Sequence, residues 1–304
     1  MTSDPLHSDG LTVPGLDPAA ARRWTRRLPG SSPWLHEEVA RRMVQRLEWF
    51  REKPASWLHW EPLVGGLEAH RLLCEVLPGA DCRVWALNME RALAGTREPA
   101  KRSWNPKLWR AAREALPQDP QAPVGMLWAN MVLHHEPAPR ALMRAWHTAL
   151  KTDGFAMFSC LGPDSLKELR SVYARMGWPA PSHSFTDMHD WGDMLVASGF
   201  AEPVMDMERI HLSFSTAQAL LEELRGLGRN LNAERFKGLR GRGWNAALCE
   251  ALTAHGSRDE EGRLLLTFEV VYGHAFKPKP RVHMRAEQSV SMADMRAMLG
   301  SGRS

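Results

Sequence analysis

The sequence lacks a long apolar run, and this absence excludes several classes of protein. No segment approaches the roughly 20 consecutive apolar residues that a membrane-spanning helix needs. The first residues, MTSDPLHSDGLTVPG, contain no apolar core of the kind found in a secretory signal. We therefore expect a soluble, cytoplasmic protein that does not bind membranes.

Cysteine is also scarce. The four cysteines are Cys74, Cys82, Cys160 and Cys249, and no two of them form a Cys-x-x-Cys pair. This spacing favours neither a zinc site nor a redox motif. We therefore predict no bound metal, and we expect reduced, buried thiols of the kind found in a reducing compartment.

Basic residues exceed acidic ones only slightly, giving a net charge of +4 and a pI of about 9.0. Such a surface can attract nucleic acid, a membrane or an acidic protein, although a solvated surface is the simpler interpretation. The tryptophan-containing basic stretch 85–109 could stack bases, but packing over the sheet is favoured. Because the chain has no run of five or more basic residues and no RNA-binding signature, we expect no nucleic-acid partner.

Short apolar runs alternate with helical patterns along most of the chain. Strands separated by helices of ten or more residues indicate βαβ units and a mostly parallel α/β sheet. The runs that predict strands are ASWLHWEP, CRVWALNM, PVGMLWANMVLHH, DGFAMFSCL, EPVMDMERIHLSFS and GRLLLTFEVVYGHAFKP. We expect a disordered N-terminus (1–17), one domain (18–277) with a helical insert at about 216–260, and a flexible tail (278–304).

The stretch TALKTDGFAMFSCLGPDSLKELR resembles class I S-adenosylmethionine-dependent methyltransferases, and more narrowly the malonyl-acyl-carrier-protein O-methyltransferases of biotin synthesis. The loop LWANMVLHHEPAP, the segment FTDMHDWGDMLVASGFAEPVMDMERIHLSFS and the last strand RLLLTFEVVYGHAF also resemble this family. The resemblance covers about residues 18–277 and is strongest from about 125 to 230. A mitochondrial complex I assembly factor family shares much of the same C-terminal pattern.

This resemblance implies a Rossmann-like sheet of seven strands with one antiparallel edge strand. It implies that S-adenosylmethionine, the methyl donor, lies across the carboxyl ends of the first strands. The implied substrate is the free carboxylate of a malonyl group on an acyl carrier protein, which is methylated on the route to the pimeloyl part of biotin. Carrier proteins are acidic, and the basic balance of this chain is compatible with such a partner.

The segment where the family holds its donor departs from the family pattern, Asp/Glu-x-Gly-x-Gly-x-Gly. The glycines of that pattern let the backbone approach the donor. In WLHWEPLVGG, His59 takes the place of the acid, Glu61 and Leu63 replace the first two glycines, and Gly65 keeps the third. At the end of the second strand Asn88 replaces the acidic residue that grips the ribose, and an amide lacks the charge-assisted bonds of a carboxylate.

Two interpretations of this segment remain open. In the first, the enzyme binds S-adenosylmethionine through a rebuilt loop, with Gly65, Gly66, Asn88 and Asn130 as donor-binding residues. In the second, the chain is a catalytically silent pseudo-methyltransferase that acts as a binding or assembly factor. Replacing a glycine where the backbone meets a ligand typically costs more than about 1–2 kcal/mol, which argues against donor binding of normal affinity.

A malonyl carboxylate requires a cation, but the reaction requires no strong base because this nucleophile is already ionised. Arg170 and Arg175 are candidates for a bidentate grip, with a surface position on a helix as the simpler interpretation. His134 follows the third predicted strand and could shape the pocket, and Tyr173 could reach into it. Because His134 and His135 are adjacent, they do not form a metal pair.

The bend Gly162-Pro163-Asp164-Ser165 directly follows a predicted strand. Asp164 and Ser165 suggest a nucleophile, but a turn with a helix cap is the favoured interpretation. Glu168 lies three residues after Ser165, which is the spacing of a capping box.

Overall fold

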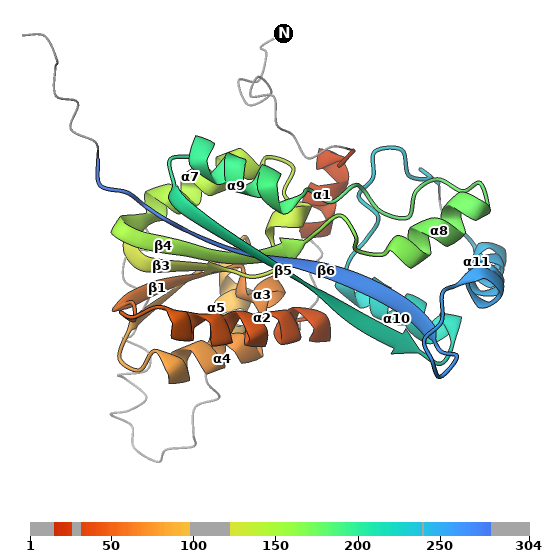
Figure 1. The fold of residues 1–304 in the computed structure, drawn as a ribbon, viewed down its shortest axis with the longest axis horizontal. Coiled ribbons are helices and arrows are strands. Elements are labelled where there is room, and N and C mark those ends of the chain that lie inside the picture. Colours follow the sequence, from red (N-terminus) through yellow and green to blue (C-terminus); the bar gives the residue numbers. More distant parts are fainter. Residues whose placement is uncertain (1–14, 26–31, 98–121, 239, 281–304) are drawn as a thin grey trace, which may run out of the picture.

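The computed structural model describes residues 15–25, 32–97, 122–238 and 240–280, which form a six-stranded sheet (Figure 1). The four parallel strands β1 to β4 and the strands β5 and β6 all coincide with predicted runs. The sheet order is β2-β1-β3-β4-β6-β5. The strands are β1 (Ser56–Trp60), β2 (Asp81–Trp85), β3 (Val124–Ala129), β4 (Leu150–Leu161), β5 (Ala201–Phe214) and β6 (Leu264–Phe276).

The expected arrangement of seven strands with one antiparallel edge strand is only partly observed. The described residues form six strands, so the count of seven is not confirmed. The antiparallel strand, β6, pairs with both β4 and β5 and therefore lies inside the sheet, while β5 lies at the edge. Burial explains the order, because nearly every residue of β6 is buried whereas those of β5 are mostly exposed or half-buried.

Helices cover both faces of the sheet (Figure 1). Trp57 of β1 packs in one core with Met43, whereas Leu58 packs in the other core with Trp146. Neighbouring residues of a strand point to opposite faces, so this alternation builds two apolar layers. The helices of the first layer are α2 (Trp34–Arg46) and α4 (Leu67–Val76), and those of the second are α7 (Pro139–Ala149) and α9 (Met188–Ala197).

Three further helices gather at one end of the sheet, at the right of Figure 1: α8 (Lys167–Arg175), α10 (Ala217–Leu227) and α11 (Arg242–His255). The last two fall in the segment expected to be a helical insert. The short elements are α1 (Pro18–Thr25), α3 (Pro62–Gly65), α5 (Met89–Thr96) and 3-10 turns at Leu47–Trp49 and Leu133–His135. Within the described ranges, no helix is long and apolar enough to cross a membrane. The expectations for residues 1–14, 98–109 and 281–304 lie outside the described residues.

The bend after β4 is held by β6, and the predicted helix cap is wrong. Helix α8 begins at Lys167, and no side chain caps it. The buried Ser165 hydroxyl instead donates to the Glu269 carbonyl and accepts from the Glu269 N–H, both at 3.0 Å. The Glu168 carboxylate accepts from the Thr267 N–H at 2.9 Å and from its hydroxyl at 2.5 Å. These contacts with β6 leave Ser165 unavailable as a nucleophile.

Substitution of Ser165 tests whether β6 holds this bend. We expect Ser165→Ala to lower the free energy of unfolding by about 1–3 kcal/mol, because it removes the hydroxyl that bonds to both the N–H and the carbonyl of Glu269. The control is Ser171→Ala at an exposed position of α8, which we expect to stay within about 0.5 kcal/mol of the parent. Urea denaturation measures both, and equal stabilities would contradict the contact.

Candidate functional site

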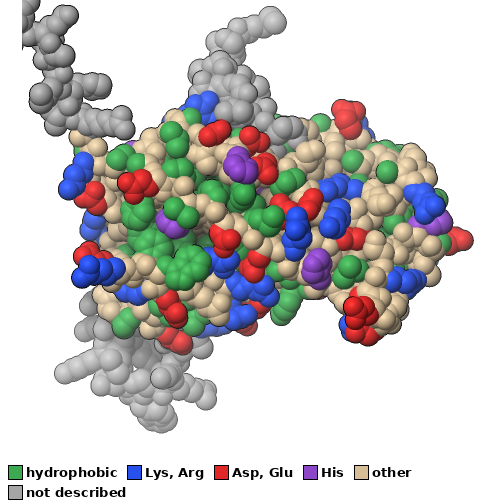
Figure 2. Space-filling view, viewed as in Figure 1, with side chains coloured by type: hydrophobic (Ala, Val, Ile, Leu, Met, Phe, Trp, Pro, Cys, Tyr) green, Lys and Arg blue, Asp and Glu red, His purple; other side chains and the backbone are tan. Residues whose placement is uncertain are grey.

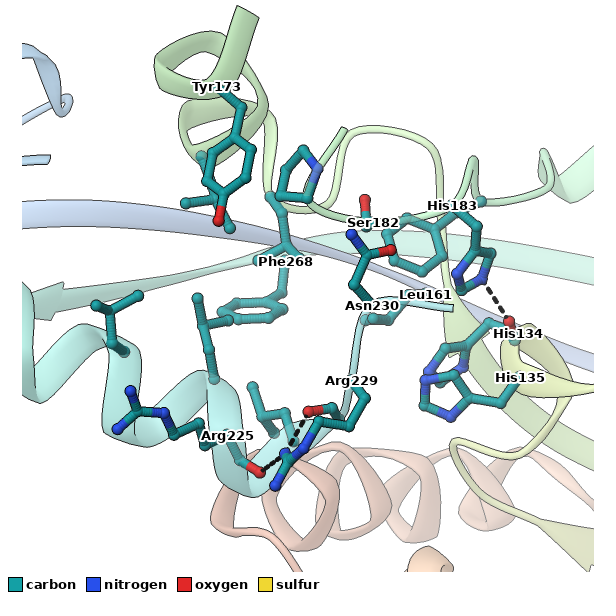
Figure 3. Close-up of a pocket in the computed structure, with 18 of the residues that line it drawn as sticks. His134, His135, Leu161, Tyr173, Ser182, His183, Arg225, Arg229, Asn230 and Phe268 are labelled. Atoms are coloured by element: carbon teal, nitrogen blue, oxygen red, sulfur yellow. Dashed lines mark hydrogen bonds between the residues drawn. The ribbon is translucent and has the colours of Figure 1, made fainter. Parts of the chain in front are cut away.

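A pocket of about 350 Å³ opens between the sheet and the helices α8, α10 and α11 (Figure 3). Its volume lies in the range of roughly 300–1,000 Å³ that is typical of small-molecule sites. The walls come from the ends of β4 and β6, from the turn after β3 and from these helices. Most of the lining is apolar and includes Leu161, Leu166, Leu169, Leu221, Leu248 and Phe268.

Three arginines supply the charge of this pocket. The Arg240 guanidinium lies 3.6 Å from the ring centroid of Trp244, and Arg225 donates to the Asn245 side-chain oxygen at 3.0 Å. Arg229 donates to the carbonyl of Gly228 at 2.7 Å. Within the described residues, none of the three arginines forms an ion pair with a carboxylate, and no Asp or Glu lines the pocket. Arginine cations without a counter-ion favour an anionic ligand.

Two of the predicted substrate residues, Tyr173 and His134, do line the pocket, on different sides of it (Figure 3). Burial raises the pKa of Tyr173, so its phenol stays neutral and can donate a hydrogen bond. Burial lowers the pKa of His134 well below its usual range, and the imidazole is therefore neutral. The His134 carbonyl accepts from the ring of His183 at 2.8 Å, which fixes the turn after β3 against the pocket.

The other two predicted substrate residues lie outside the lining. Arg170 donates to the carbonyls of Pro163 and Ser165, both at 2.7 Å, and so stabilises the bend before α8. Arg175 is exposed on α8. Arg170 thus supports the bend and Arg175 lies at the surface, and binding of a carboxylate by this pair stays a prediction. The pocket cations come from the helical insert and the loops beside it.

On the donor side, Glu61 bridges the ends of β1 and β2. It adopts a left-handed backbone conformation, with φ of +54°, that suits the glycine of the family pattern. Its carboxylate accepts from the Leu87 N–H at 2.7 Å, and its own N–H donates to the Trp85 carbonyl at 2.7 Å. Burial raises the pKa of Glu61. A protein carboxylate thus occupies the edge where an open α/β sheet usually receives its ligand.

A second carboxylate of the chain occupies the start of α4. Glu37 of α2 accepts from the N–H groups of Glu68 and Ala69 at 3.2 and 3.0 Å, while the Ser32 hydroxyl accepts from that of Leu67 at 3.1 Å. The start of a helix binds anions through such N–H groups. In this chain the N–H groups at the start of α4 already donate to Glu37 and Ser32. Gly66 has φ of +114°, a backbone conformation that favours glycine, and an added side chain would approach the Glu37 carboxylate to 2.7 Å.

The predicted donor residues Asn130, Gly65 and Asn88 also have internal partners. The buried Asn130 amide donates to the carbonyls of His36 and Gly65 at 2.8 and 2.7 Å and accepts from the Ser159 hydroxyl at 2.5 Å. A side chain at Gly65 would lie 3.0 Å from the His59 ring. Asn88 caps α5 by accepting from the Arg91 N–H at 3.0 Å.

These residues do not fit S-adenosylmethionine in the way that the family loop would hold it. Glu61 links the carboxyl ends of β1 and β2, and Asn130 links those of β1 and β3. A void beside Leu63 and His36 measures about 10 Å³, which is about the space of a single water molecule. We therefore assign no side chain of this chain to the methyl donor.

Sequence reasoning missed the residues that matter most on each side. Arg225, Arg229 and Arg240 belong to no motif in the sequence, because only the folding of the segment 216–260 brings them to the pocket. Glu37 and His36 lie in a helix about 30 residues before the loop that they contact. In the sequence, His36, Glu37 and Arg240 are polar residues close to apolar helical positions. Many solvated residues have such neighbours, so this pattern does not single them out.

Substitution of Glu61 tests the obstruction. We expect Glu61→Gly to raise the affinity for S-adenosylhomocysteine about 10-fold or more, because the parent must break a charged hydrogen bond of about 1.5–3 kcal/mol to admit a nucleoside. Glu202→Gly is the matched control, since exposed Glu202 in β5 also has a left-handed backbone, with φ of +51°. Isothermal titration calorimetry measures both, and an unchanged affinity in Glu61→Gly would contradict the obstruction.

Sequence comparison places the chain among known proteins. No family model matches it. It is 38% identical to the malonyl-[acyl-carrier protein] O-methyltransferase of Gallionella capsiferriformans over 262 residues, which cover 83% of this chain and 87% of that protein. It is also 38% identical to the protein of the same name from Laribacter hongkongensis over 255 residues, covering 81% and 84%.

Among solved structures, a SAM dependent methyltransferase from Archaeoglobus fulgidus is 13% identical, with a TM-score of 0.40 and coverage of 79% of this chain and 94% of that one. This likeness is too low to support an argument. The two sequence relatives are sufficient, because each match spans more than four-fifths of both chains at 38% identity. The chain belongs to the malonyl-[acyl-carrier protein] O-methyltransferase family.

Proposed function

We propose that this chain methylates the free carboxylate of a malonyl group carried on an acyl carrier protein, on the route to the pimeloyl part of biotin. Its relatives, named for this reaction, support the activity. The observation that carries the proposal is an apolar pocket with three arginines and no acidic side chain in its lining. S-adenosylmethionine as the donor rests on the family alone, and we derive no step through it.

The pocket residues can hold such a substrate without a base. The carboxylate oxygen is already a nucleophile at neutral pH, so positioning is the main requirement. The apolar floor can take the acyl-thioester arm, while an arginine and the neutral Tyr173 phenol orient the carboxylate. Arg240 is the favoured cation, because stacking on Trp244 already fixes its guanidinium and so reduces the entropy lost on binding.

An acyl carrier protein suits the charge of this chain. Carrier proteins are acidic, and the net charge here is +4. On the face drawn in Figure 2, basic and acidic side chains are intermixed without a continuous basic stripe, so this face gives no support to a nucleic-acid partner. The cytoplasmic location remains a prediction from the sequence.

Removal of the Arg240 guanidinium tests the substrate site. We expect Arg240→Ala to weaken binding of malonyl-carrier protein about 10- to 100-fold, because a charged hydrogen bond contributes about 1.5–3 kcal/mol. The affinity of Arg240→Lys should lie between that of the parent and that of Arg240→Ala, since lysine keeps the charge but cannot make the bidentate contact. Calorimetric titration with malonyl-carrier protein and with the unloaded carrier measures the effect.

Arg175→Ala is the matched control, because Arg175 is an exposed arginine outside the pocket. We expect it to bind malonyl-carrier protein as the parent does. Equal losses in Arg175→Ala and Arg240→Ala would contradict the site and indicate a general charge effect. Tight binding with no methyl ester detected by mass spectrometry, at millimolar S-adenosylmethionine, would overturn methyl transfer and favour a silent binding factor, an alternative that the relatives' names do not favour.

A further inference from the structure

A cluster of two thiols and an imidazole lies between α4 and the edge strand β2, away from the pocket. His70 and Cys74 are four residues apart on α4 and therefore share one helix face. Cys82 is the second residue of β2. One ligand atom from each of the three lies within 4.8 Å of the other two.

The rings around this cluster fix the direction of the His70 imidazole. Its Nε2 lies 3.9 Å from the Cys82 sulfur, and its Nδ1 lies 3.0 Å from Nδ1 of the fully buried His59. The two imidazoles stack, with centroids 5.2 Å apart and planes 13° apart, and Trp57 forms a wall of the same space at 5.2 Å from His70. When His70 donates its Nδ1 proton to His59, the lone pair of its Nε2 points at the thiols.

This arrangement has the parts of a soft metal site. A zinc-bound histidine almost always donates its second ring N–H to a neighbouring group, which fixes its tautomer, and His59 is placed to accept that proton. Two thiolates and one imidazole are ligands that zinc prefers. In tetrahedral zinc sites the metal–sulfur and metal–nitrogen bonds are about 2.3 and 2.0 Å, so the ligand atoms need to close by roughly 1 Å from their present spread.

We propose that His70, Cys74 and Cys82 bind one zinc ion, with a fourth position open to water. Coordination replaces the S–H protons of the two cysteines, and the two protons pass to the solvent. Cys74 is exposed and Cys82 partly exposed, which gives the ion a path from solvent at the edge of the sheet. The inference does not depend on the proposed function, because the ligands lie outside the pocket.

The site would act as a structural link behind the donor loop. It would tie α4 to β2, and through His59 it would extend to Gly65, where an added side chain would lie 3.0 Å from the His59 ring. This proposal differs from the sequence-based expectation of no metal. Three residues separate His70 from Cys74, and seven separate Cys74 from Cys82. Only the packing of α4 beside β2 brings the three side chains together.

A cobalt titration of the full chain, purified under reducing conditions and stripped with a chelator, tests the site. We expect one equivalent of Co²⁺ to bind and to give a thiolate-to-cobalt charge-transfer band, and one equivalent of Zn²⁺ to abolish that band. Cys82→Ser and His70→Ala should each weaken zinc binding about 100-fold or more, since loss of an outer-shell partner alone costs 10- to 100-fold. Cys249→Ser, which removes a thiol in α11, is the control and should bind zinc as the parent does.

A second measurement on the unaltered chain keeps the test valid if a variant misfolds. We expect zinc to slow iodoacetamide alkylation of Cys74 at least about 10-fold, with Cys249 unaffected, as followed by peptide mass spectrometry. Absence of the charge-transfer band, zinc binding that survives Cys82→Ser, or equal alkylation of Cys74 with and without zinc would each overturn the proposal.

Discussion

The hydrogen bonds of the Asn130 side chain hold together the elements around the site. Its amide hydrogen-bonds to α2 through the His36 carbonyl, to the loop after β1 through the Gly65 carbonyl, and to β4 through the Ser159 hydroxyl. All of its partners are buried with it, and a buried amide left without them would lose several kilocalories per mole of hydrogen bonding. These hydrogen bonds hold α2 against the segment after β1 and link that segment to the end of β3.

The end of β1 and the pocket differ in how their polar groups are used. On the donor side, Glu61 and Glu37 satisfy backbone N–H groups that an exogenous ligand could otherwise use. Beside α8, α10 and α11, a pocket of about 350 Å³ contains three arginines that have no carboxylate partner among the described residues. The loop after β1 is thus held by the chain's own side chains, whereas the pocket leaves its three arginines without an acidic partner in the part of the chain that the structure describes.

Strand positions were predictable from the sequence because burial imposes local periodicity, and all six observed strands coincide with predicted runs. The altered donor loop was also evident, since Glu61 and Leu63 stand where glycines are expected. Partners distant in sequence were not predictable. Ser165 looked like a helix cap, yet its hydroxyl bonds to Glu269, 104 residues away. The place of β6 inside the sheet and the approach of Arg240 to the pocket likewise depend on tertiary packing.

A crystal structure of the protein grown with millimolar S-adenosylhomocysteine tests the central claim most directly, namely that the chain's own groups occupy the donor side. We expect bound nucleoside and the hydrogen bond between Glu61 and the Leu87 N–H to exclude each other. Either the bond between Glu61 and Leu87 is intact and no nucleoside is bound, or the nucleoside is bound and the Glu61 side chain has turned away. Nucleoside density across the ends of β1 and β2, beside an intact bond between Glu61 and Leu87, would show that Glu61 does not obstruct the donor.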